Sequence, residues 1–350
     1  MTKLPPPINS IANLIDAHHA AKKDKPRAHL GCSGIGHPCD RWIWLSFRWA
    51  VREVFPGRIR RLFRRGQNEE AIVVADLKAI GIDIRETGQD QRFVKLGSHV
   101  SGSIDGVIES GVPEAMRTRH IAEFKTHSLK SFRDLEAKGV RASKPMHWAQ
   151  CQAYMYASKI DRALYVAVCK DDDQIYTERI NLDRTEAARL VERAQKIALA
   201  ERMPDPLSTD PSWYACKFCP AHSFCHTLQM TEHVNCRTCA RSTPELDSTW
   251  SCARWDAKDI PTDFQHAACD AHVLHPDLVP WPIKDSGNPD EAVYIINGVE
   301  VRNGENDAFT FSSKEIIAGG EACAAKIVAD VKQEFPGATV VGVQEYEVPF

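Results

Sequence analysis

Hydrophobic and polar positions change their spacing several times along the chain. Where apolar and polar residues alternate, side chains point to opposite faces, which predicts strands. Where apolar residues recur every three or four positions, the pattern predicts amphipathic helices. Strands are predicted over residues 82–95, 100–109, 119–126, 163–169 and 174–180, and helices over residues 8–22, 42–49, 58–80, 129–138, 145–158 and 182–202. This order predicts a mixed α/β core in which helices flank a central sheet.

Two further regions, the start of the chain and the part after Pro282, are predicted to fold as a helix and as a small α/β module. Apolar residues of helix 8–22, namely Ile11, Leu14 and Ile15, are expected to pack this helix on the body of the protein. After Pro282, Asn297-Gly298 between apolar runs predicts a hairpin. A capping box (Ser312 with Glu315), a helix over 322–335 and a strand over 339–348 complete a small α/β module. The predicted segments are a lead (1–30), the α/β core domain (31–229), a cysteine-rich module (230–285) and the small module (286–350).

The composition and charge of the chain limit its fold type, its partners and its cellular location, but they do not identify a function. The chain has 350 residues, of which 43% are hydrophobic and 26% charged, as expected for a packed globular protein of two or three domains. The net charge of −3 means that a nucleic-acid partner needs a local basic patch. The sequence contains no apolar stretch long enough to span a bilayer and no signal-peptide pattern, so we expect a cytoplasmic location. There the 12 cysteines stay reduced, and clusters of them indicate metal sites.

Candidate chemistry centres on Glu123-Phe124-Lys125 in the strand 119–126. Because side chains alternate along a strand, Glu123 and Lys125 point to the same face. Asp105, in the preceding strand, can join them there. Two carboxylates and an ammonium group on one face form a place for a divalent cation and a polarised phosphate.

This motif, taken with its neighbours, resembles the PD-(D/E)XK nuclease superfamily. Gly66–Glu70 matches the Gly-x-x-x-Glu motif of the RecB-like branch, and Gln150–Tyr154 matches its Gln-x-x-x-Tyr motif. The resemblance is most specific to the iron–sulfur exonucleases of CRISPR systems and phage recombination. It implies a restriction-endonuclease-like core and Mg²⁺ or Mn²⁺ bound by Glu70, Asp105, Glu123 and the Phe124 backbone carbonyl. Glu69 is an alternative to Glu70, since adjacent helical residues point about 100° apart.

The resemblance also assigns roles to the remaining polar residues of these motifs. Lys125 orients or deprotonates the attacking water or stabilises the transition state, and the sequence does not separate these roles. Gln150 forms a hydrogen bond with the phosphate or with Lys125, and Tyr154 forms one with the DNA backbone. A run of arginines just before Glu70 is either a solvated helix face or a phosphate-binding surface. The arginines predicted to bind DNA are Arg60, Arg61, Arg64 and Arg65.

Two cysteine sets predict further metal sites. The first has the spacing C-x₂-C-x₅-C, and the resemblance implies that it holds a [4Fe–4S] cluster with Cys39 as the distant ligand; Cys32 is a less favoured substitute, and Zn²⁺ also suits four thiolates. The second begins with C-x₂-C and predicts a zinc-ribbon-like site, with His272 as an alternative ligand to Cys269. The first set is Cys39, Cys216, Cys219 and Cys225, and the second is Cys236, Cys239, Cys252 and Cys269.

The function that these features predict is a metal-dependent DNA exonuclease of phage-type recombination or repair. Its partners would be linear or single-stranded DNA ends and a phage single-strand annealing protein, in the cytoplasm of a bacterial host. The alternatives are a nucleic-acid-binding adaptor that does not cut, and a structure-specific endonuclease. The sequence leaves the polarity, the oligomeric state and the role of the C-terminal module open.

Overall fold

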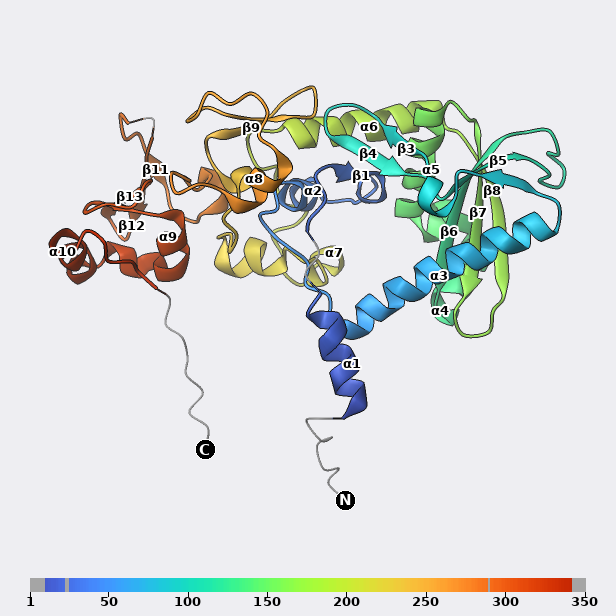
Figure 1. Cartoon of the computed structure of the whole chain (residues 1–350), viewed down its shortest axis with the longest axis horizontal. Helices are drawn as coiled ribbons and strands as arrows, with labels where there is room; N and C mark the ends of the chain where they lie inside the picture. Colours follow the sequence, from blue (N-terminus) through green and yellow to red (C-terminus); the bar gives the residue numbers. More distant parts are fainter. Residues whose placement is uncertain (1–9, 23–24, 289, 342–350) are drawn as a thin grey trace, which may run out of the picture. The chain divides into compact units, whose positions relative to one another are not determined.

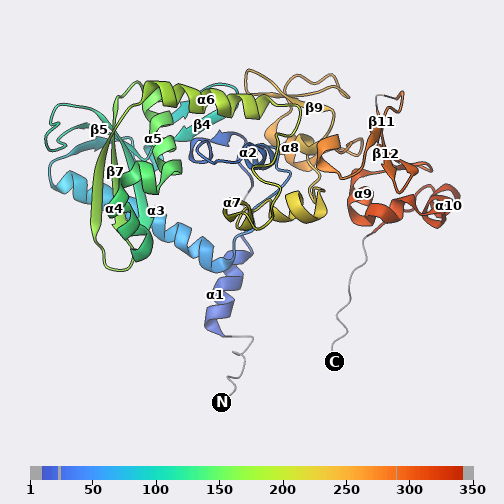
Figure 2. The same ribbon diagram turned by 180° about the vertical axis from the view of Figure 1, so that it is seen from behind.

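The computed structural model describes residues 10–22, 25–288 and 290–341 (Figures 1 and 2). The chain divides into two compact units. The first comprises Met1–His37 and Glu53–Lys196, and the second comprises Pro38–Arg52 and Ile197–Phe350. The second unit thus takes in a short early segment as well as the C-terminal part of the chain. The four-segment division made from the sequence remains a prediction.

The first unit is built on a five-stranded sheet with the order β2-β5-β6-β7-β8. All neighbouring strands are antiparallel except β6 and β7, which are parallel. A parallel pair needs a crossover connection, and the helices α4 and α5 supply it. The strands are β2 (Asp83–Arg85), β5 (Gly106–Ser110), β6 (His120–His127), β7 (Arg162–Cys169) and β8 (Ile175–Asn181), and the helices are α4 (Leu129–Ser143), α5 (Pro145–Ser158) and α6 (Arg184–Leu199).

The two faces of β6 have different surroundings. Phe124 packs into a hydrophobic cluster with residues of the long helix α3 (Gly57–Ala79), among them Val73 and Leu77. Because side chains alternate along a strand, Glu123 and Lys125 point to the opposite face. The helix α5 also packs against β6. The mixed α/β core predicted from the sequence is therefore confirmed, and β6 presents its charged residues away from the apolar cluster.

A smaller sheet of three strands, β1 (Leu30–Gly31), β4 (Val100–Ser103) and β3 (Phe93–Lys95), changes one prediction. The strand expected over 100–109 is broken at Ile104 and Asp105, so that β4 belongs to the small sheet and β5 to the large one. The Asp105 carboxylate accepts a hydrogen bond from the Phe124 backbone N–H at 2.8 Å. An aspartate side chain can accept a backbone N–H in place of a strand carbonyl oxygen. Here this hydrogen bond holds the Asp105 carboxylate against β6.

The helix α1 (Ile11–Ala20) corrects a second prediction. Ile11, Leu14 and Ile15 are exposed, whereas the sequence pattern suggested that they pack on the protein body. The helix instead contacts α3 through an ion pair between Asp16 and Arg61 and through the close approach of the Asp16 backbone to Gly57. The helix α1 is thus held by a polar contact with α3, which the spacing of its apolar residues does not predict.

The second unit begins with α2 (Asp40–Phe47), whose aromatic residues Trp44 and Phe47 are buried. Two buried arginines pack among those rings: Arg237 lies 3.8 Å from the ring centroid of Trp49, and Arg48 lies 4.7 Å from that of Trp44. Arg237 also donates a hydrogen bond to the Phe47 carbonyl oxygen at 2.9 Å. These contacts connect α2 to the segment that begins the second cysteine set. The other elements of this part are α7 (Tyr214–Lys217), β9 (Ser242–Pro244), β10 (Trp250–Cys252) and α8 (Thr262–Ala267).

The C-terminal part of this unit contains a four-stranded sheet with the order β11-β12-β13-β14. The predicted hairpin is confirmed, with Asn297 and Gly298 both at positive φ between β12 and β13. The predicted helix 322–335 begins with a 3₁₀ turn, and its α-helical part is α10. The predicted strand 339–348 is absent from residues 339–341, and its remainder lies outside the described residues. The elements are β11 (Ile283–Lys284), β12 (Ala292–Ile296), β13 (Val299–Asn303), β14 (Thr310–Phe311), α9 (Ser313–Gly319) and α10 (Lys326–Glu334).

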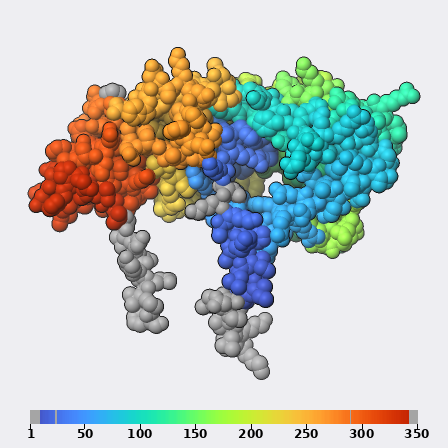
Figure 3. Space-filling view, in the orientation of Figure 1, coloured from blue at the N-terminus to red at the C-terminus, as the bar shows by residue number. Residues whose placement is uncertain are grey.

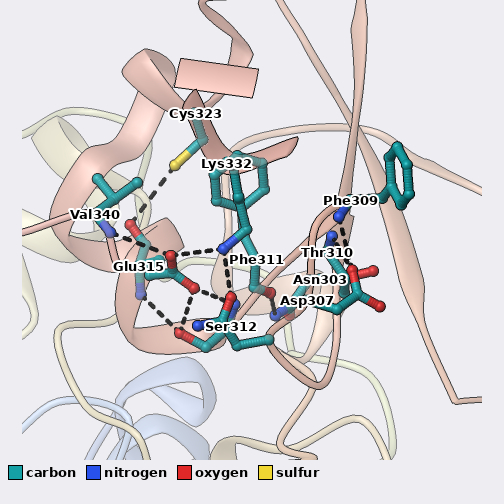
Figure 4. Close-up of polar contacts among 11 residues, drawn as sticks. Asn303, Asp307, Phe309, Thr310, Phe311, Ser312, Glu315, Cys323, Lys332 and Val340 are labelled. Atoms are coloured by element: carbon teal, nitrogen blue, oxygen red, sulfur yellow. Dashed lines mark hydrogen bonds and ion pairs between the residues drawn. The ribbon is translucent and has the colours of Figure 1, made fainter. Parts of the chain in front are cut away.

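A buried ion pair between Glu315 and Lys332 connects α9 to α10 (Figure 4). Both side chains are only 3% exposed, and their charged atoms are 2.9 Å apart. The Glu315 carboxylate also accepts hydrogen bonds from the Ser312 and Val340 backbone N–H groups. The Ser312 hydroxyl completes the capping box that the sequence predicted. Burial opposes ionisation of Glu315, but these donors outweigh it and lower its pKa.

We expect Glu315→Gln to destabilise this unit by about 3–5 kcal/mol, because it leaves the Lys332 ammonium buried without a counter-charge. A depressed carboxyl pKa stabilises the fold above the unfolded-state pKa, and this contribution is lost as the pH falls through the folded-state pKa. Denaturant unfolding as a function of pH should therefore show a loss of stability in acid that Glu315→Gln abolishes. The exposed pair Lys284–Glu300 provides the control, since Glu300→Gln removes a solvent-screened charge and should change the stability little. Equal costs for both substitutions would contradict this account.

None of the helices in the described ranges combines the length and the apolar content that crossing a bilayer requires.

Candidate active site

A cavity of about 580 Å³ in the first unit gathers most of the predicted catalytic residues. It lies between the charged face of β6, the helix α5, the helix α3 and the small sheet. Glu70, Asp105, Lys125, Gln150 and Tyr154 all line it, although they come from four separate segments of the chain. The cavity is also lined by Arg27, His29, Cys32, Ser33, Gln91, Gly102, Ser103, Met146 and His147.

Glu123 is fully buried and is not itself a lining residue of this cavity. One carboxylate oxygen, Oε1, forms an ion pair with the Lys125 ammonium group. The other, Oε2, is buried and has no hydrogen-bond partner. A buried carboxylate oxygen without a partner costs free energy unless a ligand satisfies it. Glu123 therefore has an open acceptor position, although it is already paired on one side.

Asp105 and Glu70 complete the acidic group. Asp105 is held by the hydrogen bond from Phe124, and Glu70 Oε1 accepts a hydrogen bond from Gln91 Nε2 at 2.6 Å. Of the two adjacent glutamates, the structure places Glu70 on the cavity, whereas Glu69 is not among the lining residues. The Phe124 carbonyl oxygen, the fourth predicted metal ligand, lies 3.2 Å from Lys125 Nζ.

The carboxylates of this group resist ionisation. Burial is the main cause that raises the pKa of each, and the charge of Asp105 adds to the effect on Glu70 and on Glu123. The Lys125 ammonium opposes the rise at all three positions, but a single positive charge does not compensate three carboxylates. A hard divalent cation with oxygen ligands, such as Mg²⁺ or Mn²⁺, matches this donor set and its excess negative charge. The residues present therefore fit the ion.

The site is not drawn together around a cation. Within the described part of the chain, no three His, Cys, Asp or Glu side chains form a ready-made metal-binding group.

The raised carboxyl pKa values predict that metal binding depends on pH. A group whose pKa is raised by folding stabilises the fold below its unfolded-state pKa and loses that contribution as the pH rises through the folded-state pKa. The metal-free protein should therefore lose stability between about pH 5 and about pH 8, and Mg²⁺ or Mn²⁺ should restore it. We expect the metal-induced rise in Tm to be larger at the upper pH and to be greatly reduced in Glu123→Gln. A rise in Tm that does not change with pH would contradict the proposed ligand set.

Gln150 and Tyr154 lie one helical turn apart on α5 and face the cavity together. Gln150 Nε2 is 3.4 Å from the Tyr154 hydroxyl. Tyr154 is seated against Gly102, where a Cβ atom would lie 2.8 Å from the Tyr154 hydroxyl oxygen. Only glycine therefore allows the small sheet to approach this ring as closely as it does.

The predicted arginine surface is only partly available. Arg61 is paired with Asp16, and Arg65 donates a hydrogen bond to the Lys170 carbonyl oxygen at 2.7 Å. Arg64 is exposed and Arg60 is half-buried. The helix α3 that carries them lies on the visible surface of its unit (light blue, Figure 3). At least Arg61 and Arg65 of these four arginines therefore make contacts within the protein.

The first cysteine set is gathered in the second unit. Cys39, Cys216, Cys219 and Cys225 together line a small cavity of about 20 Å³ with Trp42. Cys39 is the N-cap of α2, and its sulfur accepts a hydrogen bond from the Trp42 backbone N–H. Cys32, the less favoured substitute, instead lies in the first unit beside Tyr154. Of the two candidates for the distant ligand, Cys39 is therefore the one beside the other three cysteines.

The second cysteine set also lies together. Burial raises the pKa of the Cys236 thiol to about 12, and the neighbouring thiols of Cys239, Cys269 and Cys252 add to the rise. His272, the alternative ligand, is 2% exposed. Its Nδ1 is 2.8 Å from the Ser313 hydroxyl and its Nε2 is 3.0 Å from the Asn235 carbonyl oxygen. With both ring nitrogens engaged, His272 is not available in this arrangement, which leaves Cys269 as the fourth candidate.

The sequence did not point to several residues of the cavity. Gln91 follows a turn and has no motif around it, Arg27 and His29 lie in an irregular segment, and Ser33 lies in a short 3₁₀ helix. His147 could have been found, because it lies three residues before Gln150 and thus on the same face of α5.

Comparisons with known proteins agree with the fold. A family model described as the PD-(D/E)XK nuclease superfamily matches residues 22–226, which is more than half of the chain and includes all six predicted catalytic residues. No curated protein matches the sequence. Two solved structures show a weak likeness: the protein SSO0001 (TM-score 0.36, 17% identity, 60% of this chain and 91% of that one) and LHK-Exo in complex with dAMP (TM-score 0.35, 15% identity, 53% and 89%). LHK-Exo is an alkaline exonuclease from Laribacter hongkongensis. At TM-scores below 0.5 these two add nothing to the family match.

Proposed function

The chain belongs to the PD-(D/E)XK nuclease superfamily, and we propose that it is a divalent-metal-dependent deoxyribonuclease that hydrolyses phosphodiester bonds at DNA ends. One observation carries the proposal: Glu123, buried beside Lys125 and grouped with Asp105 and Glu70, keeps one carboxylate oxygen without a partner. A salt bridge on the surface of a strand would not leave a buried carboxylate oxygen without a partner. A metal-dependent phosphodiesterase uses such an oxygen to bind its metal ion.

In this proposal the carboxylates of Glu70, Asp105 and Glu123 and the Phe124 carbonyl hold the metal ion. The bound ion would supply a nucleophilic water and neutralise charge on the phosphate. The ammonium group of Lys125, held between Glu123 and the cavity, orients the attacking water and stabilises charge on the phosphoryl oxygens. Gln150 donates a hydrogen bond to the phosphate from the opposite wall, and the Tyr154 hydroxyl donates one to the DNA backbone. The exposed Arg64 contacts more distant phosphates, and Arg60, Arg61 and Arg65 can join it only by leaving contacts that they make within the protein.

Both cysteine sets enter this proposal as structural metal sites. Cys39, Cys216, Cys219 and Cys225 hold a [4Fe–4S] cluster, and Cys236, Cys239, Cys252 and Cys269 hold Zn²⁺. The shared cavity of the first set and the mutual proximity of the second support these assignments. Neither set forms a closed group of ligands in the described residues, so each would close around its metal. Iron analysis and absorption near about 400 nm test the cluster, and a colourless protein that carries only zinc would contradict it.

A role in phage-type recombination, with a single-strand annealing protein as partner, is the biological setting that this activity would suit. Comparing linear with closed-circular DNA in the presence of Mg²⁺ tests the preference for ends. Cleavage confined to linear DNA supports an exonuclease. Equal cleavage of both supports the endonuclease alternative, and binding of DNA without any cleavage supports the adaptor alternative.

A further inference from the structure

A histidine that has no assigned role lies in the wall of the active-site cavity. His147 is on α5, one turn before Gln150, and lines the cavity with Lys125 and Asp105. Its Nδ1 is 2.8 Å from the hydroxyl oxygen of Tyr165. Its Nε2 has no hydrogen-bond partner among the residues that the structure describes. One ring nitrogen is thus held from behind, and the other is left for a ligand in the cavity.

The Tyr165 hydroxyl belongs to a longer chain of hydrogen bonds. It is also 3.0 Å from His127 Nε2, and His127 Nδ1 is 3.2 Å from the Ser131 hydroxyl. Tyr165 lies on β7 directly opposite Glu123, and His127 follows Lys125 on the same face of β6. The series of hydrogen bonds therefore runs from the half-buried Ser131 on α4, along the face of β6 that carries Glu123 and Lys125, to the cavity.

The chemistry of the four groups allows a continuous direction of donation. A hydroxyl between two imidazoles donates to one and accepts from the other. If Ser131 donates to His127 Nδ1, then His127 Nε2–H donates to Tyr165, and Tyr165 donates to His147 Nδ1. The remaining proton of His147 is then on Nε2, on the side of the cavity. Burial is the main cause that lowers the pKa of His127 to about 4, with Lys144, Lys170 and Lys125 adding to it, so this ring is neutral at neutral pH.

The ring of His147 is also neutral at neutral pH. Burial lowers its pKa to about 3, and the Lys125 ammonium is the next largest cause. A neutral imidazole whose Nδ1 is occupied by a donor presents an N–H to the cavity, and it cannot act there as a metal ligand without losing that proton.

Resting on the nuclease function proposed above, we propose that His147 is a catalytic residue that donates its Nε2 proton to the oxygen that leaves phosphorus, and that Tyr165, His127 and Ser131 are positioning residues that replace this proton. The water oxygen forms the new bond to phosphorus and gives one proton to bulk water. The bond from phosphorus to the leaving sugar oxygen breaks, its electron pair stays on that oxygen, and the oxygen takes the proton from His147 Nε2.

The replacement proton moves along the chain in one direction. His147 Nδ1 takes the Tyr165 proton, Tyr165 takes the proton of His127 Nε2, His127 Nδ1 takes the Ser131 proton, and Ser131 takes one from solvent. The residues return to their starting state when a proton enters at His147 Nε2 and another leaves at Ser131. Atoms and charges balance without any oxidant or reductant.

A substrate with sulfur in place of the leaving bridging oxygen tests this proposal, because a thiolate leaves without protonation. The substrates are linear duplexes with a bridging 3′-sulfur or a bridging 5′-sulfur, so that either cleavage polarity is covered. On ordinary DNA, His147→Ala should lower kcat by about 10²-fold and Tyr165→Phe by about 10-fold, with little change in KM. On the sulfur substrate that the enzyme cleaves, both variants should come within about threefold of the wild type. Tyr156→Phe, on the exposed side of the same helix, serves as the matched control and should leave both rates unchanged.

Equal losses on the oxygen and sulfur substrates would overturn the role of His147 as an acid. A second measurement does not depend on activity: the ¹⁵N chemical shifts of the histidine rings should show the Nε2–H tautomer for His147 and for His127. An Nδ1–H tautomer of His147 would also overturn the proposal. If the wild-type protein cleaves no DNA, the proposed nuclease function fails, while the tautomers still report on the chain of hydrogen bonds.

Discussion

Lys125→Ala should abolish DNA hydrolysis, lowering kcat by at least about 10³-fold, while the protein stays folded. The ammonium group is paired with Glu123 and lines the cavity, and its loss removes charge stabilisation at the place where a phosphate would bind. Removal of one preorganised donor from a transition-state site costs about 10²–10³-fold in kcat, and Lys125 would also position the water. Single-turnover cleavage of end-labelled linear DNA at saturating Mg²⁺ measures this effect.

The design of this experiment separates chemistry from folding. Lys130→Ala removes an exposed lysine of α4 from the same unit and should leave the rate unchanged. Lys125→Arg keeps the charge but alters its geometry, and it should restore little activity. If Lys125→Ala cleaved DNA at a rate near that of the wild type, the role given to this residue would be wrong.

Cys39→Ser should remove most of the bound iron and destabilise the second unit by several kcal/mol. Cys39 comes from the early segment of that unit, whereas its three partners follow residue 210, so a shared cluster would connect two distant parts of the chain. Metal binding contributes directly to folding free energy when the site forms only in the folded state. Iron content per chain, visible absorption and thermal unfolding together measure the loss.

A buried cysteine outside both sets provides the control. Cys169 ends β7 in the first unit, and Cys169→Ala should keep the full iron content. If Cys39→Ser kept the same iron content as the wild type, Cys39 would not be a ligand. If Cys32→Ser lost the iron instead, the less favoured substitute would be the right one, against its position beside Tyr154.

The periodicity of the sequence predicted which of the candidate catalytic residues share a face of a strand or a helix. Alternation along β6 placed Glu123 and Lys125 on one face, and the four-residue spacing of Gln150 and Tyr154 placed them on one side of a helix. These predictions rest on local geometry, which a short segment carries by itself. The choice between Glu69 and Glu70 needed the structure, because both fit the motif and only the packing of α3 decides which one reaches the cavity.

Features that depend on distant partners were not predictable in the same way. The break at Asp105 arises because its side chain takes the Phe124 N–H, and no pattern within 100–109 announces it. Ile11 and Leu14 are exposed, and α1 contacts α3 through an ion pair that periodicity does not encode. His272 has a residue type suited to zinc, and its contacts with Asn235 and Ser313, which engage both ring nitrogens, come from distant segments of the chain.

The most direct test of the central claim is the release of nucleotides from linear DNA by the purified wild-type protein, with Mg²⁺ or Mn²⁺ and with a chelator in its place. The account predicts metal-dependent hydrolysis that the chelator stops and that restored metal recovers. Binding of DNA without hydrolysis, by folded protein with its metals in place and under every divalent cation tested, would contradict it.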